Sequence, residues 1–160
     1  ADSTATIMTS IDQRFSKGKV WSDDNKRIFH DNTGYIILQA DTCITLTENK
    51  EGQWKDFMGM YKPEILKSKL FSVYLKHRKD APASYVYLTL PATTQQKVRD
   101  FDSRSVHIIR NDKKAQAAVI NDLCYASVYH PTNLLIDNDN PIAISEPGTY
   151  IIHIKKKETP

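Results

Sequence analysis

Apolar and polar residues alternate over most of this chain. In Lys69–Pro91 every second residue from Phe71 to Leu75 is apolar, and after a polar break the alternation resumes from Val86 to Leu90. A period of two is typical of strands that bury one face. Two such runs, separated by a polar segment that contains a proline, predict an antiparallel hairpin at the centre of the fold.

The same alternation predicts further short strands on both sides of this hairpin, separated by Asn, Asp, Gly and Pro residues. Asp31–Gly34 is expected to form a tight turn, because its residues tolerate a positive φ. Gln53–Met58 is expected to continue the β pattern, with Trp54 and Met58 on an apolar face. The other expected strands are Arg27–His30, Tyr35–Gln39, Cys43–Glu48, Val106–Arg110, Ala115–Ile120, Leu123–Val128, Leu134–Ile136, Ile142–Ser145 and Tyr150–Lys155.

One segment, Thr93–Phe101, has the character of a helix. Thr93 or Thr94 can cap the N–H groups at its start, and Val98 and Phe101 lie three residues apart on one face. The segment is short and lies where the composition becomes polar. We therefore expect it to connect two β parts of the chain, with a boundary near Asp102.

These elements predict an all-β fold of antiparallel β-sandwich layers with one short connecting helix near 93–101. Several short strands separated by turn residues are typical of such sandwiches. The chain is expected to divide into a first β domain at residues 1–91, a helical connector at 92–104 and a small antiparallel β domain at 105–160.

Composition and charge agree with a folded globular protein and argue against some partners. The 160 residues are 40% hydrophobic and 26% charged, which is ordinary for a globular domain. No apolar run approaches the ~20 residues of a membrane-spanning helix. No secretion signal opens the chain, whose first residues look like the edge of a domain. The net charge of +3 is too small to indicate nucleic-acid binding, so we expect neither nucleic acid nor membrane as a partner.

The residues that commonly form metal sites do not cluster in the sequence. The five histidines never occur as a close pair, so there is no local zinc spacing. Asp137-Asn138-Asp139 lacks the glycine and glutamate that an EF-hand requires further along, which favours a simple turn. A calcium site built from Asp137, Asp139 and a distant carboxylate stays open as the weaker alternative. Cys43 and Cys124 are expected to be buried and free, and a disulfide is the alternative.

Motifs of catalytic sites are also missing. With five glycines the chain offers no Gly-rich phosphate loop. His77, Tyr85 and Tyr87 lie near one another and could abstract a proton, but such catalysis also needs a group that stabilises the carbanion. Cross-strand packing explains both tyrosines equally well, and we favour it. The sequence therefore predicts no catalytic residue.

Five short motifs follow one another along the chain. They are Thr9–Arg14 with Gly18 and Val20, Phe29–Asp31 with Gly34 and Tyr35, Glu51–Trp54, His77–Pro91 with its Tyr-x-Tyr-x-x-Leu-Pro, and Val106–Gln116. No single motif is specific, but in this order they resemble polysaccharide lyase family 8. That family contains the chondroitin, hyaluronate and xanthan lyases.

The resemblance implies that this chain is part of a longer enzyme whose catalytic residues lie in a separate domain. In that family an N-terminal α/α toroid carries the catalytic Tyr, His, Asn and Arg, and a large antiparallel super-sandwich and a small C-terminal β domain follow. This chain would be the end of the super-sandwich plus the C-terminal domain, so no catalytic residue carries over. The parent enzyme would be secreted or periplasmic and would cleave a uronic-acid-containing polysaccharide by β-elimination. Partners implied are that acidic polysaccharide, through the parent enzyme, and the upstream toroid; no cofactor is expected, although calcium is compatible with the parent.

Two other interpretations stay open. A stand-alone carbohydrate-binding module needs exposed aromatic residues that stack on sugars, and Trp21, Trp54, Tyr61 and Tyr129 are the candidates. A purely structural support would instead bury these aromatic residues between its sheets. The exposure of the two tryptophans therefore separates the two interpretations.

Overall fold

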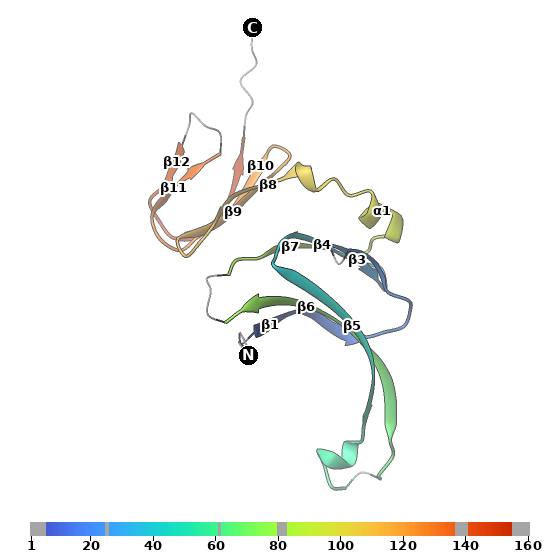
Figure 1. The fold of residues 1–160 in the computed structure, drawn as a ribbon. Helices are drawn as coiled ribbons and strands as arrows, with labels where there is room; N and C mark the ends of the chain where they lie inside the picture. Colours follow the sequence, from blue (N-terminus) through green and yellow to red (C-terminus); the bar gives the residue numbers. More distant parts are fainter. Residues whose placement is uncertain (1–5, 25, 61, 80–82, 137–140, 155–160) are drawn as a thin grey trace, which may run out of the picture. The chain divides into compact units, whose positions relative to one another are not determined.

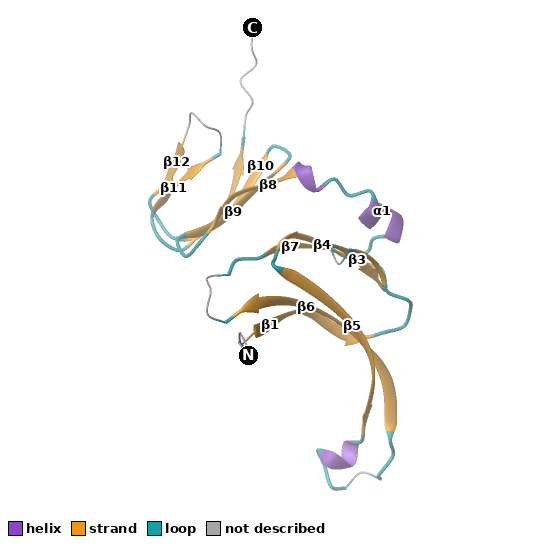
Figure 2. Ribbon diagram, viewed as in Figure 1, coloured by secondary structure: helices purple, strands orange, loops and turns teal. Residues whose placement is uncertain are grey.

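The computed structural model describes residues 6–24, 26–60, 62–79, 83–136 and 141–154. These residues form thirteen strands, one α-helix and two short 3₁₀ turns (Figure 2), so the predicted all-β class with a single short helix is confirmed. The chain divides into two compact units, Ala1–Phe101 and Asp102–Pro160.

The first unit is a sandwich of two antiparallel sheets (Figure 1). Its core lies between the sheets, because the strands of each sheet turn alternate apolar side chains toward the other. Ile28 and Tyr35 from one sheet contact Phe71, Val73 and Leu75 from the other. One sheet has the order β1 (Thr6–Phe15), β6 (Leu66–Arg78), β5 (Thr42–Gly52), and the other has the order β2 (Trp21–Asp23), β3 (Arg27–His30), β4 (Thr33–Gln39), β7 (Val86–Leu90).

A short helix, α1 (Gln95–Arg99), packs against β3 and β4. Thr94 caps it as predicted, since its hydroxyl accepts a hydrogen bond of 3.3 Å from the N–H of Lys97. Val98, which belongs to the helix, is fully buried. The predicted helix is thus confirmed, and it is shorter than the segment 93–101 in which it was expected.

The predicted hairpin in Lys69–Pro91 is wrong, although both of its strands exist. β6 pairs with β1 and β5, whereas β7 pairs with β4 in the opposite sheet. Leu88 and Leu90 lie opposite Ile36 and Gly34, on the side of the sheet that α1 covers. The alternation correctly indicated that each strand buries one face, but it carries no information about which neighbour covers that face.

Gly34 lies under α1 at a point where a side chain does not fit. A Cβ there would lie 2.2 Å from Cγ2 of the buried Val98. We expect Gly34→Ala to lower the free energy of unfolding by about 1–3 kcal/mol, the usual cost of overpacking a core. Gly52→Ala is the matched control, because, apart from its chain neighbours, no described residue comes within 4 Å of a Cβ at that position. Chemical denaturation measures both, and equal losses would contradict close packing of the helix.

β5 and β6 continue beyond the other strands as a two-stranded ribbon (Figure 1). We call residues 49–69 the arm. At its tip the chain forms a 3₁₀ turn, Trp54–Asp56, so the expected β segment at Gln53–Met58 is wrong. Trp54 and Met58 are exposed instead of lying on an apolar face, because the ribbon has no second sheet to pack against.

The second unit combines a four-stranded and a two-stranded antiparallel sheet around its own core. Ala115, Cys124 and Leu134 lie completely buried at the centre of this core. β9 and β10 have the predicted bounds, and β11, β12 and β13 begin one or two residues earlier than expected. The sheets have the orders β13 (Gly148–His153), β10 (Leu123–Val128), β9 (Ala115–Ile120), β8 (Val106–Asn111), and β11 (Thr132–Leu135), β12 (Pro141–Ile144).

Both cysteines are free and buried, as predicted. Burial raises the pKa of the Cys43 thiol to about 11 and also raises the pKa of Cys124. Both side chains therefore act as small apolar groups of the two cores. Among the described residues, no helix has the length and apolar character needed to cross a bilayer.

Candidate functional site

A polar cluster lies between the two sheets of the first unit. Asp12 and Arg14 belong to β1 and lie opposite Val73 and Phe71, so they share the inward face with those residues. Arg14 donates to Oδ2 of Asp12 (2.7 Å from Nε) and to the Thr33 hydroxyl (3.0 Å). It also donates to the hydroxyl of Tyr35, which in turn donates to Asp12. We call Asp12, Arg14, Thr33 and Tyr35 the inter-sheet network.

The charged groups of this network are stabilised by hydrogen bonds within the network. Burial raises the pKa of Asp12, but hydrogen bonds from Arg14 and Tyr35 outweigh burial and hold that pKa below its usual value. Burial and the hydrogen bond to Asp12 raise the pKa of the Tyr35 hydroxyl well above its usual value. Tyr35 therefore stays protonated at neutral pH and is a poor base. The network ties β1 to β4 through hydrogen bonds, and its Arg14 and Asp12 side chains are only partly exposed, at 33% and 22%.

His30 lies beside this network, with its ring stacked on Phe71 at 4.1 Å between centroids. Nε2 is 2.9 Å from the Ser16 hydroxyl and 3.3 Å from Oδ2 of Asp31. A Ser–His–Asp triad needs the serine and the carboxylate on different ring nitrogens. Here both lie on Nε2, Nδ1 is buried and has no hydrogen-bond partner among the residues that the structure describes, and the ring is fully buried. This set of residues is therefore unsuited to nucleophilic catalysis.

The buried His30 is expected to make the first unit less stable in mild acid. Burial lowers the pKa of the ring below 6.5, although the charge of Asp31 opposes this shift. The unfolded chain then takes up a proton more readily than the folded chain, so stability is full above pH 6.5 and falls as the pH drops below it. Chemical denaturation at about pH 7.5 and about pH 5.5 should show this loss.

The matched variants for this pH effect are His30→Phe, which retains an aromatic ring against Phe71, and His107→Gln at an exposed position. We expect the loss of stability between the two pH values to shrink in His30→Phe and to persist in His107→Gln. An undiminished loss in His30→Phe would assign the pH dependence to another group.

His77, Tyr85 and Tyr87 form a row of parallel rings. The His77 and Tyr85 centroids are 6.2 Å apart, and those of Tyr85 and Tyr87 are 6.4 Å apart. The hydroxyl oxygen of Thr9 lies 3.4 Å from Nε2 of His77. Since His77 belongs to β6 and Tyr87 to β7, this row connects the two sheets. The geometry supports the packing interpretation of these residues.

The structure describes three of the four aromatic residues singled out from the sequence. Trp21 is half-buried in β2 beneath the guanidinium of Arg99, 5.1 Å from its ring centroid. Trp54 lies at the tip of the arm, 59% exposed. Tyr129 belongs to the second unit, is exposed, and donates a 3.1 Å hydrogen bond to Oε1 of Gln116. Tyr61 lies outside the described residues.

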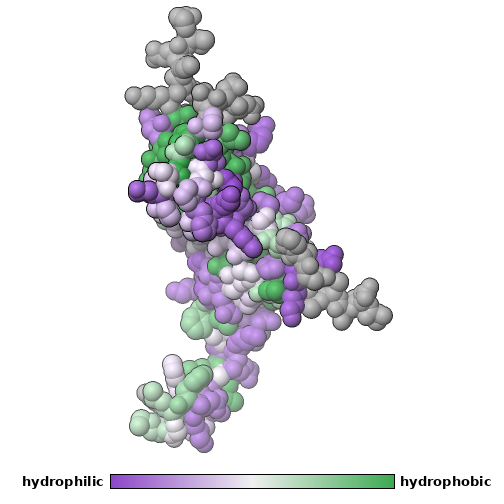
Figure 3. Space-filling view, turned by 90° about the vertical axis from the view of Figure 1, so that its left-hand side faces the viewer, coloured by the Kyte–Doolittle hydropathy of each residue, from purple (hydrophilic) through white to green (hydrophobic). Residues whose placement is uncertain are grey.

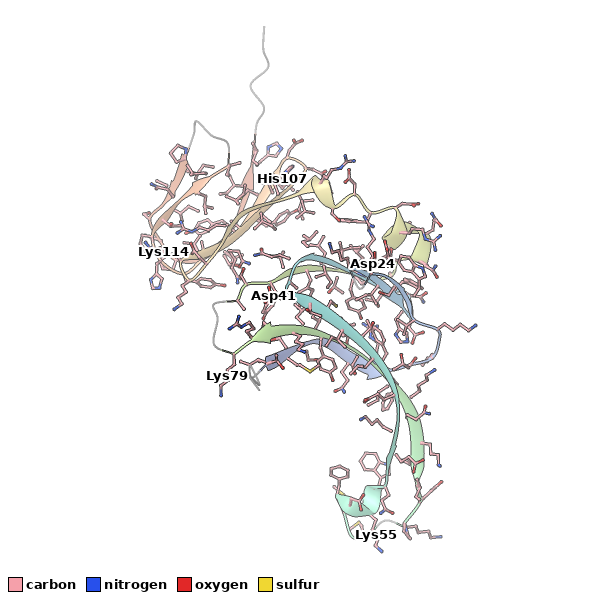
Figure 4. The ribbon with its side chains drawn as sticks, in the orientation of Figure 1. Asp24, Asp41, Lys55, Lys79, His107 and Lys114 are labelled. Carbon is pink, nitrogen blue, oxygen red and sulfur yellow. The ribbon has the colours of Figure 1, made fainter. Side chains whose placement is uncertain are left out.

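The tip of the arm is an apolar surface that the sequence analysis missed. Phe57 is 81% and Met60 88% exposed, and Trp54 contacts Phe57 edge to face at 6.4 Å. Figure 3 shows hydrophobic side chains at this tip, at the bottom of the view. Figure 4 places Lys55 there as well. The available signal was that four large apolar residues lie within seven positions, Trp54–Met60, without the alternation of a strand.

Each unit also has an open cavity. In the first unit a cavity of about 460 Å³ has Asp24 and Asp41 in its wall. In the second unit a cavity of about 560 Å³ has Arg110 and Lys114 in its wall. Within the part of the chain that the structure describes, no three His, Cys, Asp or Glu side chains are grouped to hold a metal. Asp137 and Asp139, the two named ligands of the weaker calcium alternative, lie outside those residues.

Comparison with known proteins relates the fold to a group of enzymes. Residues 1–102 match the sequence model of the polysaccharide lyase family 8 super-sandwich domain. A hyaluronate lyase of Thermasporomyces composti is 25% identical over 126 residues, which are 76% of this chain and 16% of that protein. The chondroitin AC lyase of Streptomyces coelicolor A3 is similar over 96% of this chain and 21% of its own, with a TM-score of 0.76 and 18% identity.

Two further solved structures have the same fold. A chondroitinase AC lyase has a TM-score of 0.77 and 16% identity over 96% of this chain and 25% of its own. A Paenibacillus xanthan lyase has a TM-score of 0.65 and 14% identity over 84% of this chain and 16% of its own. The Streptomyces coelicolor enzyme was also solved in complex with chondroitin sulphate.

This chain therefore spans between 16% and 25% of the length of these relatives. The solved structures, all below 25% identity, support the fold, and the sequence match carries the assignment. Because the super-sandwich match extends over residues 1–102 of 160, this chain belongs to polysaccharide lyase family 8.

Proposed function

We propose that this chain is the C-terminal β scaffold of a secreted lyase that cleaves uronic-acid-containing polysaccharides by β-elimination, and that it supplies no catalytic residue itself. The closed inter-sheet network carries this proposal. β-Elimination needs an accessible base and a group that neutralises the uronate carboxylate. Asp12, Arg14 and Tyr35 have the right chemistry, but they bond to one another between two sheets.

The substrate class follows from the relatives. Hyaluronan and chondroitin sulphate both contain uronic acid, and these are the polymers named for the hyaluronate and chondroitin lyases described above. We therefore propose an acidic polysaccharide as the partner of the whole enzyme.

The test is to mix the purified chain with chondroitin sulfate, hyaluronan and xanthan. The ultraviolet absorbance of the unsaturated uronate product measures elimination, and the full-length lyase serves as the positive control. We expect no product from the chain alone. Sustained turnover by the chain would overturn the scaffold proposal.

The tip of the arm is the proposed contact with the rest of the enzyme, the upstream catalytic toroid. An isolated two-stranded ribbon is marginally stable, and exposed apolar clusters commonly mark interaction sites. Trp54, Phe57 and Met60 contribute little to the sandwich core because they lie at the far end of the ribbon. The relatives are four to six times longer than the matched segment, which leaves ample protein to cover this tip.

Paired measurements on the chain and on the whole lyase test this contact. We expect Trp54→Ala with Phe57→Ala to leave the thermal midpoint of the isolated chain unchanged and to lower that of the whole lyase. Lys55→Ala, a polar change at the same tip, is the matched control. An unchanged midpoint in both forms would rule out the proposed contact.

Carbohydrate binding is the second candidate function, and the exposure of Trp54 and Tyr129 favours it. An exposed aromatic ring can stack on a sugar, whereas Trp21 is partly covered by Arg99. Calorimetric titration of the isolated chain with neutral and acidic oligosaccharides tests this function. Binding that is lost in Trp54→Ala or in Tyr129→Ala would support a binding module; no heat of binding in any titration would remove it.

A further inference from the structure

The cavity in the second unit has the composition of an anion-binding site. The residues of its wall include two basic ones, Arg110 and Lys114, and three other polar ones, Thr132, Asn133 and Ser145, beside three apolar residues. No carboxylate belongs to this wall among the described residues. The volume of about 560 Å³ is enough for a sugar ring with its substituents.

Arg110 is held in place at this cavity. Its Nε donates to Oδ2 of Asp112 at 2.7 Å, and a terminal nitrogen donates to the Thr132 hydroxyl and to the Asn133 carbonyl, the latter at 3.3 Å. A guanidinium fixed by three partners loses little conformational entropy when it binds an anion. This side chain is therefore pre-organised for a ligand.

Asp112 forms an ion pair with Arg110, and its other carboxylate oxygen binds the turn. Its Oδ1 accepts hydrogen bonds from the backbone N–H groups of Lys114 (2.7 Å) and Ala115 (3.1 Å). These backbone bonds and the one from Arg110 lower the pKa of Asp112, so it stays ionised. Residues 110–114 thus hold one carboxylate and three basic side chains, Arg110, Lys113 and Lys114, so this β8–β9 turn keeps an excess of positive charge.

The main chain of Lys114 is fixed from both sides. Its carbonyl accepts hydrogen bonds from the N–H groups of Tyr129 (2.8 Å) and His130 (3.2 Å), and its own N–H donates to Asp112. Figure 4 shows Lys114 at the edge of the unit. The side chain therefore starts from a rigid point on the rim, while Lys113 lies on the same turn but outside the cavity wall.

We propose that this cavity binds an anionic group, a sulfate or a carboxylate, of an acidic polysaccharide. That a polysaccharide carries this anion rests on the proposed function. The cavity of the first unit offers a contrast, since its wall has two acidic residues, Asp24 and Asp41, and one basic residue, Lys26. Of these two cavities, the one in the second unit is thus the better match to an anionic group.

The experiment follows backbone amide resonances of the whole chain during titration with inorganic sulfate, a chondroitin sulfate oligosaccharide, an unsulfated hyaluronan oligosaccharide and a neutral oligosaccharide. We expect shifts confined to the turn and to the cavity wall with the three anionic probes. Stronger binding of chondroitin sulfate would identify sulfate as the group bound, and equal binding of hyaluronan would identify the carboxylate.

Lys114→Gln and Lys113→Gln are matched variants, because both remove one charge from the same turn. We expect Lys114→Gln to weaken binding of the anionic probes about threefold or more, as for loss of a partly exposed ion pair, and Lys113→Gln to leave it nearly unchanged. Equal weakening in both variants, or shifts with the neutral probe, would overturn the site in favour of general surface charge. Binding of sulfate alone would overturn the polysaccharide ligand, whereas elimination by the isolated chain would overturn only the scaffold proposal.

Discussion

Replacing Phe71 with alanine is expected to lower the free energy of unfolding of the first unit by about 3–5 kcal/mol, the usual cost of truncating a buried phenylalanine. Phe71 is completely buried, and its ring centroid lies 4.1 Å from that of His30 and 6.1 Å from that of Tyr35. It extends from β6 to the opposite sheet, so its loss leaves a cavity between the sheets. Chemical denaturation followed by circular dichroism measures the change.

Phe15→Ala is the matched control, because Phe15 lies on the neighbouring strand β1 and is 67% exposed. We expect this change to cost less than about 0.5 kcal/mol. If the two variants lost the same stability, or if Phe71→Ala cost less than the control, the face-to-face packing of the sheets would be wrong. The comparison therefore tests the correction of the hairpin topology as well as the core.

Replacing Arg14 with alanine is expected to cost about 2 kcal/mol of unfolding free energy. Removing one partner of a buried ion pair leaves an uncompensated charge, which in a fully buried setting costs about 3–5 kcal/mol. The Arg14 and Asp12 side chains are 33% and 22% exposed, so part of that cost is screened by solvent. Tyr35 would remain as a donor to the carboxylate but without its positive partner.

Two further variants separate the cost of the unpaired charge from the cost of shortening the side chain. Asp12→Asn combined with Arg14→Ala should cost less than the sum of the single changes, because the unpaired charge is gone. Lys67→Ala breaks the exposed pair with Glu51 and should cost less than about 0.5 kcal/mol. Strict additivity of the first pair would show that the inter-sheet network does not couple these residues.

The acid sensitivity of the first unit should have two stages. His30 accounts for the loss below pH 6.5, as argued above. The pKa of Asp12 is lower in the folded chain than the usual 3.8, so its contribution is present above pH 3.8 and is lost as the pH falls below it. Arg14→Ala should weaken the second stage and also reduce the first, because the charge of Arg14 adds to burial in lowering the pKa of His30.

The candidate sites could be predicted from the sequence only in part. Trp54 was singled out as an exposed aromatic residue and is one, but Trp21 is partly covered by Arg99. The inter-sheet network and the basic cavity were not predicted. Arg110 and Thr132 meet across 22 positions, and Arg14 and Tyr35 across 21, and no local pattern connects them.

The sequence by itself determined the strand content, the capped helix at Thr94 and the turn at Asp31 and Asn32, where both residues have a positive φ. These features depend on neighbouring residues, through a period of two, a capping hydroxyl and local backbone preference. Tertiary structure alone decided that β6 and β7 belong to opposite sheets, that the arm extends beyond the sandwich and that the buried acid–base groups satisfy one another. The physical reason is that alternation specifies a face to be buried, whereas the neighbour that buries it is chosen by contacts between distant parts of the chain.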